Sequence, residues 1–187
     1  MRNAFVLATL AICSACSAPD QETVRTVAAI EVPFNSPADH ADLVSILRRH
    51  ASADGDMHVD DVSDSWRKFE AENGPTLPGG KGTIYAGVWR GANDDELIAD
   101  ISDMGHPGRV WVTFVKGEHV ARATRFRQGV LADIRGRWPD VKAIPVLPSG
   151  GVPLAEDLVL TAQGYQINPA VAPNYELSKS SPMVAHK

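Results

Sequence analysis

Three aspartates stand close together at Asp54, Asp56 and Asp60, within the stretch SADGDMHVDDVS. Carboxylate oxygens at this spacing can bind a hard cation, because Ca²⁺ takes six to eight oxygen ligands. The same stretch also suits an acidic, glycine-containing turn between two helices, in which Asp60 or Asp61 caps the second helix. Both interpretations expect a helix on each side of the turn, and the sequence leaves both open.

The stretch resembles the calcium loop of an EF-hand. Asp54, Asp56 and Asp60 take the third, fifth and ninth positions of that loop. Ser63 stands at the twelfth position, where the family has a glutamate that donates two oxygens. The resemblance implies a calcium-responsive module, with the three aspartates as candidate metal ligands.

Arginines beside predicted strand ends form a second group that could do chemistry. Arg90 lies in VWRG and Arg109 in HPGR, where His106 shares the same turn. Guanidinium groups bind carboxylates and phosphates, so converging strand ends would make an anion-binding corner. The alternative is that these arginines pair with nearby aspartates such as Asp94 and Asp95 and serve the fold alone.

Aromatic residues alternate with small or apolar ones along the predicted strands. This alternation predicts that Tyr85, Trp89 and Trp111 share one face of a sheet, together with Asp100 and Thr113. Rings flanked by polar groups can stack on sugar rings or form the centre of a protein interface. The alternative is that two N-terminal helices cover this face as part of the core.

Both cysteines of the chain, Cys13 and Cys16, lie near its start in LATLAICSACSAPD. A positive Arg2 precedes an apolar run of signal-peptide length, which falls short of the ~20 residues that a membrane span needs. The run CSAC resembles the lipobox of bacterial lipoproteins. The resemblance implies that Cys16 is acylated and becomes the mature N-terminus.

The same resemblance implies a location. Ser17 rather than aspartate after the acylated cysteine implies the outer membrane, with the domain facing the periplasm. Plain cleavage after Ala18 is the alternative, and it would give a soluble periplasmic or secreted protein. In either case Cys13 is removed, and the lipid occupies the thiol of Cys16 in the first case. The mature domain then lacks a thiol nucleophile, a cysteine zinc site and a disulfide.

The chain has 187 residues and a net charge of −5. The charge is uneven, with 12 acidic and 5 basic residues over 20–72 and 8 basic and 3 acidic residues over 109–142. The two segments either face each other in the fold or bind a charged partner. An acidic exported protein is not suited to nucleic acid, because phosphate contacts need a basic face.

Helical spacing predicts helices over 39–53, 60–72 and 121–138, and alternation predicts an antiparallel meander followed by a fourth strand. This order predicts an α+β two-layer sandwich, in which an N-terminal helix pair and a crossing helix pack with the meander. A strand at MHVDDV would give an order close to ferredoxin-like. The expected organisation is a signal peptide over 1–15, a lipid-anchored tether over 16–38, a single α+β domain over 39–168 (a helical pair over 39–73, then sheet plus helix over 82–168) and a mobile tail over 169–187.

These observations favour a noncatalytic envelope lipoprotein that binds a protein or peptidoglycan partner, in the manner of an inhibitor or immunity protein, without a cofactor. A hydrolase that uses His106 with Asp100 or Asp103 is the alternative from another class. The membrane contact would be the lipid on Cys16. The expected partner-binding residues are Tyr85, Trp89, Arg90, His106, Arg109 and Trp111.

Overall fold

The computed structural model describes residues 25–74, 84–103 and 108–177. Cys16 and His106 therefore lie outside the described residues. The elements are β1 (Thr26–Pro33), α1 (Pro37–Asp54), β2 (Met57–Asp61), α2 (Ser63–Asn73), β3 (Tyr85–Arg90), β4 (Glu96–Ser102), β5 (Arg109–Val115), α3 (Val120–Arg137), β6 (Lys142–Ile144), a 3₁₀ turn (Ala155–Asp157), β7 (Leu158–Thr161), β8 (Gly164–Ile167) and α4 (Ala172–Leu177).

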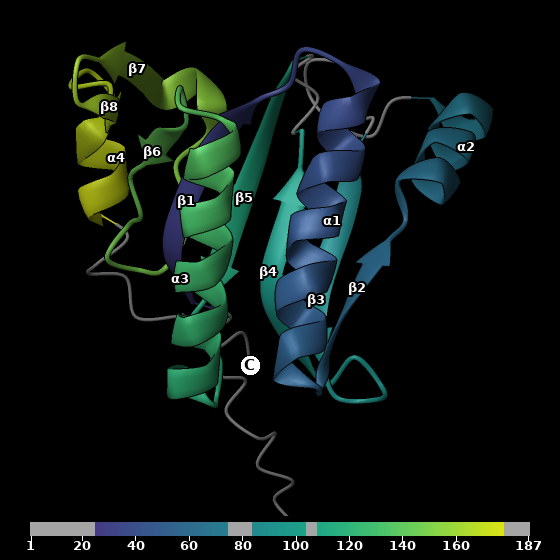
Figure 1. Ribbon diagram of the computed structural model, residues 1–187. Coiled ribbons are helices and arrows are strands. Elements are labelled where there is room, and N and C mark those ends of the chain that lie inside the picture. Colours follow the sequence, from purple (N-terminus) through teal and green to yellow (C-terminus); the bar gives the residue numbers. More distant parts are fainter. Residues whose placement is uncertain (1–24, 75–83, 104–107, 178–187) are drawn as a thin grey trace, which may run out of the picture.

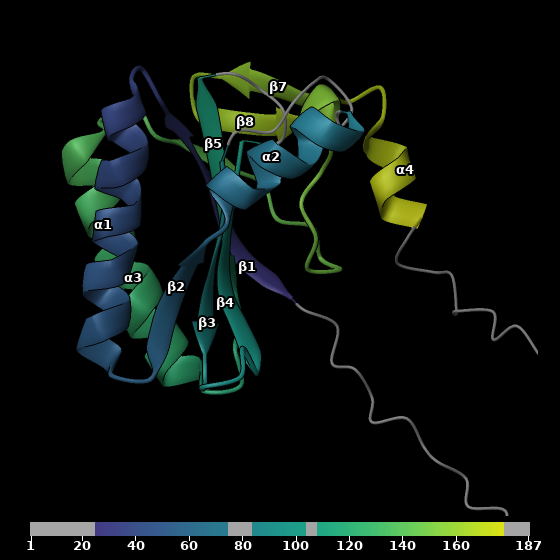
Figure 2. The ribbon, with the colours of Figure 1, turned by 90° about the vertical axis from the view of Figure 1, so that its right-hand side faces the viewer.

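The main sheet has six antiparallel strands in the order β2-β3-β4-β5-β1-β6, and β7 and β8 form a separate hairpin (Figure 1). Helices α1 and α3 lie side by side on one face of the sheet, whereas α2, β7, β8 and α4 lie on the other side (Figure 2). The predicted α+β class is confirmed. In this order β5 and β6 flank β1, and α3 connects β5 to β6.

The core lies between the sheet and the helix pair α1 and α3. Alternate residues of β3 and β5 point toward the helices, as the sequence predicts. The ring centroids of Phe114 and Phe126 of α3 lie 6.5 Å apart. Each fully buried side chain of this kind contributes about 1.5–3 kcal/mol. Fully buried members of this core include Leu43, Leu47, Val88, Ile101, Val112, Phe114, Val130 and Ile134.

Local signals fix both ends of α1. Ser36 precedes the helix, Pro37 occupies its first turn, and Asp39 accepts the backbone N–H of Ser36 at 2.8 Å. The helix ends at Gly55, which adopts a left-handed φ of 81° that glycine accommodates without strain. Arg122 and Arg137 of α3 pair with aspartates of α1, so part of the acidic segment faces part of the basic one.

The prediction of a helix over 60–72 is wrong at its start. Met57–Asp61 form β2, which pairs with β3, and α2 begins only at Ser63. Met57 is buried and Val59 packs against the core, which is the alternation of an edge strand. The helical spacing of Val62, Trp66 and Phe69 belongs to α2 and does not extend back into 57–61.

The expected tether over 16–38 is also too long. The run TVAAIEV within it, which the sequence allows as a short edge strand, belongs to β1 (Thr26–Pro33), and β1 lies between β5 and β6 rather than at an edge. Its residues Ile30 and Val32 belong to the core, and Ala29 faces the opposite side. Pairing with β5, about 80 residues away, and with β6, about 115 residues away, places this segment in the sheet, and no local pattern encodes that pairing.

The C-terminal segment packs on the second face of the sheet. Trp111, Ala29 and Ile144 form a small buried cluster there, against which Leu158 and Tyr165 pack. α4 reaches into the region expected as a mobile tail. The hydroxyl of Tyr175 in α4 accepts the backbone N–H of Leu154 at 3.1 Å.

Candidate functional site

The C-terminal segment and α2 leave part of the second face of the sheet uncovered by described residues. We call this part the open face. It is the side of β2, β3 and β4 that carries His58, Asp60, Tyr85, Gly87, Trp89 and Asp100. Cross-strand pairing places these side chains on one side, since directly paired residues share a face. The sequence correctly predicted that Tyr85, Trp89 and Asp100 lie together.

Aromatic rings mark the end of the open face nearest α2. Tyr85 stacks on Trp66 with ring centroids 5.4 Å apart, and Phe69 lies 5.9 Å from Trp66. Tyr85 remains 39% exposed and Phe69 47% exposed. Ser63 fixes α2 to β3, because its hydroxyl oxygen accepts the backbone N–H of Tyr85 at 3.0 Å. The rings are therefore held in place and still reach solvent.

Gly87 allows the indole of Trp89 to lie across β3. A Cβ at Gly87 would stand 2.4 Å from Nε1 of Trp89, closer than any side chain tolerates. Glycine inside a strand commonly marks a place where another group approaches the backbone closely. The indole N–H has no hydrogen-bond acceptor among the described residues. Trp89 therefore presents a donor and a flat ring at the centre of the open face.

Asp100 lies on β4, the strand beside β3. It is paired across the sheet with Gly87 on one side and with Thr113 on the other. Burial raises the pKa of the Asp100 carboxyl to about 6, and a hydrogen bond from the backbone N–H of Ile101 only partly opposes that effect. The charge of Asp100, and burial after it, raise the pKa of Tyr85 above its usual value. Asp100 is thus a partly buried carboxylate close to two aromatic side chains.

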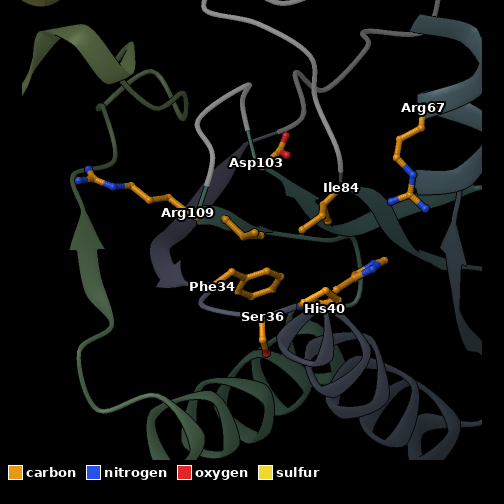
Figure 3. Close-up of a pocket in the computed structure, with 10 residues that line it drawn as sticks. Phe34, Ser36, His40, Arg67, Ile84, Asp103 and Arg109 are labelled. Atoms are coloured by element: carbon orange, nitrogen blue, oxygen red, sulfur yellow. The ribbon is translucent and has the colours of Figure 1, made fainter. Parts of the chain in front are cut away.

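A separate cavity of about 410 Å³ lies at the end of the sheet where α1 begins (Figure 3). Arg67 of α2 and His40 of α1 point toward each other on one side of it, and Arg109 extends away on the other side (Figure 3). Nε2 of His40 lies 3.3 Å from Oδ2 of Asp61. The cavity is lined by Phe34, Ser36, Pro37, His40, Arg67, Ile84, Asp103, Gly108, Arg109 and Val110.

Asp61 is held in its charged form. Burial alone would raise its pKa, but the hydroxyl and backbone N–H of Ser63, followed by the charges of His40 and Arg48, outweigh burial and lower that pKa. The hydroxyl of Ser63 donates to Asp61 at 2.6 Å. Asp61 therefore links the start of α2 to the wall of the cavity.

The predicted anion-binding corner does not form. Arg90 ends β3 beside Glu96, whereas Arg109 begins β5 at the opposite end of the sheet. The length of β4 separates them by about 20 Å. The Arg90 side chain is only 14% exposed and lies 2.5 Å from Glu96, 3.4 Å from Glu118 and 3.8 Å from Asp56. Arg90 is thus engaged in ion pairs within the protein, and its partners are Glu96, Glu118 and Asp56 rather than the expected Asp94 or Asp95.

Trp111 is not available to a partner. It is only 5% exposed, and its indole N–H donates to Glu31 at 3.1 Å. The same carboxylate accepts the hydroxyl of Tyr165 at 2.8 Å, and Arg109 donates to that hydroxyl at 3.0 Å. The sequence correctly allowed that part of this face is covered. The C-terminal segment, rather than an N-terminal helix pair, covers it.

The calcium candidates are not arranged as in an EF-hand. Asp54 and Asp56 both pair with Arg122, at 3.0 Å and 3.3 Å, and Asp60 lies in β2. A strand rather than a helix follows the turn, because residues 57–61 pair with β3. In the described parts of the chain, no group of three or more carboxylate, histidine or cysteine side chains is placed to hold a metal.

Sequence reasoning missed the role of Gly87 and the stacking of Trp66 on Tyr85. A glycine inside the alternating run YAGVWR, two residues before a tryptophan, is the signal that could have indicated the first. The stacking of Trp66 on Tyr85 depends on where α2 packs.

Comparison of the chain with family models, with curated proteins and with solved structures finds no match. None of the helices in the described residues combines the length and apolar character that crossing a membrane requires.

Proposed function

We propose that this chain is a noncatalytic envelope protein that binds a protein or cell-wall partner in the periplasm, in the manner of an inhibitor or immunity protein. A lipid on Cys16 would hold it at the outer membrane. The lipobox-like run CSAC supports the location. The uncovered rings and carboxylates of the open face support the binding role.

The observation that carries this proposal is the aromatic group at Tyr85, Phe69 and Trp89, in which Tyr85 and Phe69 are exposed and Trp89 is half-buried. The side chains of Tyr85 and Phe69 are exposed to water, and the core lies on the opposite side of the sheet. Large exposed apolar groups that cluster on a small domain are typical of interaction sites, and aromatic residues dominate the binding energy of such sites.

Capture of partners from an envelope extract of the source cell tests the proposal. The full chain with a C-terminal affinity tag is compared with its Trp89→Ala and Leu160→Ala variants. Leu160 is 57% exposed on β7, outside the open face, so it is the matched control for loss of an exposed apolar side chain. Circular dichroism confirms that each variant is folded.

We expect one partner, a protein or a wall fragment, to be retained by the wild type and by Leu160→Ala and lost from Trp89→Ala. Equal retention by all three folded proteins would show that the open face is not the binding surface. If no partner is retained by the wild type, the binding proposal itself fails.

A further inference from the structure

Among the residues that the structure describes, none places a cation beside the carboxylate of Asp100. Among the described residues no side chain donates a hydrogen bond to it, and the backbone N–H of Ile101 is the donor that opposes the effect of burial on its pKa. A partly buried charge without a partner is costly, whereas a cation placed next to it recovers much of that cost. The position therefore favours a ligand that brings a positive charge.

The aromatic side chains stand where they can hold such a cation. Gly87 is directly opposite Asp100, and the Cβ positions of directly opposed residues lie about 4.5–5.5 Å apart. Nε1 of Trp89 lies over Gly87, so the edge of the indole is close to the base of the Asp100 side chain. Tyrosine and tryptophan rings attract ammonium and guanidinium groups that lie over their faces. Tyr85 and Trp89 thus flank the space above Asp100.

The chain contains a complete example of this combination elsewhere. The guanidinium of Arg137 lies 5.1 Å from the ring of Trp138 and donates to Asp39 at 3.1 Å. Trp138 donates to the same carboxylate. On the open face, Trp89 supplies an indole and Asp100 supplies a carboxylate. No described residue supplies a guanidinium there.

We infer that the open face recognises a basic side chain, an arginine or lysine of a partner protein, that inserts between Trp89 and Tyr85 against the carboxylate of Asp100. The inference rests on the proposed function that the chain binds a partner. Asp60 of β2, paired with Gly87, adds negative charge to the same face. A neutral sugar could use the rings, but it would leave the carboxylate without a counter-charge.

The test uses a tripeptide as the probe. The full-length protein, labelled with ¹⁵N at its tryptophans, is titrated to millimolar concentration with acetyl-Gly-Arg-Gly-amide. The matched neutral probe replaces arginine by citrulline, which keeps the shape and removes the charge. The indole signals of Trp111 and Trp138 are internal controls, because both indole N–H groups already donate within the protein, to Glu31 and to Asp39. Trp89→Phe assigns the signal of Trp89.

We expect the arginine peptide, and not the citrulline peptide, to shift the Trp89 signal while those of Trp111 and Trp138 stay in place. Asp100→Asn, which removes the charge at constant shape, should weaken binding at least tenfold. Asp140→Asn, a change at an exposed aspartate after α3, should leave binding unchanged. Equal binding of both peptides, or unchanged binding by Asp100→Asn, would overturn the inference.

An oligomer of N-acetylglucosamine provides the competing probe. A shift of Trp89 with this sugar and none with the arginine peptide would overturn recognition of a basic side chain and leave wall binding in place. If neither probe shifts Trp89 but a partner is still captured through Trp89, the inference fails and the proposed function stands. If no partner is captured and no probe binds, both fail.

Discussion

Trp138 donates its indole N–H to the buried carboxylate of Asp39 at 3.1 Å, across 99 residues of sequence. The same carboxylate accepts the backbone N–H groups of Asn35 and Ser36 and pairs with Arg137. One side chain therefore caps α1 and joins it to the end of α3. Burial would raise the pKa of Asp39, but the hydrogen bonds outweigh burial and hold that pKa below its usual value.

Asp39→Ala should lower the free energy of unfolding at pH 7 by about 2–4 kcal/mol, because it removes the cap and leaves the indole N–H of Trp138 buried without an acceptor. The folded-state pKa of Asp39 lies below the unfolded value, so its stabilisation is present above the unfolded pKa and is lost as pH falls through the folded one. Urea unfolding should therefore show a difference from wild type that shrinks in acid.

Asp42→Ala is the control for this change. Asp42 also pairs with Arg137, at 2.9 Å, but about half of each side chain is exposed. Exposed pairs typically contribute about 0–1 kcal/mol, so the control should unfold nearly as the wild type does. Equal losses for Asp39→Ala and Asp42→Ala would show that the ion pair with Arg137, rather than the cap and the indole contact, provides the stability.

Asp100→Asn should stabilise the protein at neutral pH. Burial raises the pKa of Asp100 to about 6, so the folded state binds more protons than the unfolded state between pH 3.8 and about 6, and wild-type stability falls as pH rises through that window. A shift of about two pKa units corresponds to at most roughly 3 kcal/mol at pH 7. The side chain of asparagine does not ionise, so the stability of Asp100→Asn does not fall in this way as pH rises.

Unfolding by urea at pH 7 and at pH 3.5 measures the effect. The variant should gain stability over the wild type at pH 7, and the gain should disappear at pH 3.5, where both side chains are neutral. Asp140→Asn should change little at either pH, since that aspartate is exposed. A variant that is less stable at pH 7 would mean that Asp100 has a favourable partner, and this would contradict the conclusion that burial disfavours its charge.

Local signals in the sequence predicted the helices and the inward face of the sheet. Ser36, Pro37 and Gly55 mark the two ends of α1, and a four-residue repeat of apolar side chains marks α3. The alternation along β3, β4 and β5 placed Tyr85 and Asp100 on one face. Each of these features depends on contacts within a few residues or on the period of a single element.

The missed features depend on pairing between distant segments. Met57–Asp61 form a strand only because β3 lies beside them, and β1 enters the sheet through β5 and β6. The separation of Arg90 from Arg109 also follows from topology. β3 and β5 run in the same direction in a meander, so the end of one and the start of the other lie at opposite ends of the sheet.

Gly87→Ala should displace the indole of Trp89 without unfolding the domain. A Cβ there would stand 2.4 Å from Nε1, which is at the end of a movable side chain, so the ring can turn away at a cost of about 1 kcal/mol or less. Tryptophan fluorescence and the Trp89 indole signal should change, and partner capture should weaken.

Gly136→Ala in α3 is the control, because a Cβ there meets open space and should stabilise the helix by about 0.5–1 kcal/mol. An unchanged Trp89 signal in Gly87→Ala would contradict the close approach.

Binding of the arginine peptide should weaken as pH falls through about 6, since protonation of Asp100 removes the charge that attracts the guanidinium. Asp60 and His58 of β2 and Tyr85 of β3 face the same side. Tyr85 stays neutral in this range, because the usual pKa of a tyrosine, about 10, already lies far above it and the pKa of Tyr85 is raised further. Histidines in general gain charge near this pH, and His58 contacts Asp94 at 2.6 Å, so His58→Gln separates its contribution.

Peptide titrations at pH 5 and pH 7.5 should show the same pH dependence in wild type and His58→Gln and none in Asp100→Asn. A pH dependence that disappears in His58→Gln and persists in Asp100→Asn would assign the recognition charge to the edge strand instead of to Asp100.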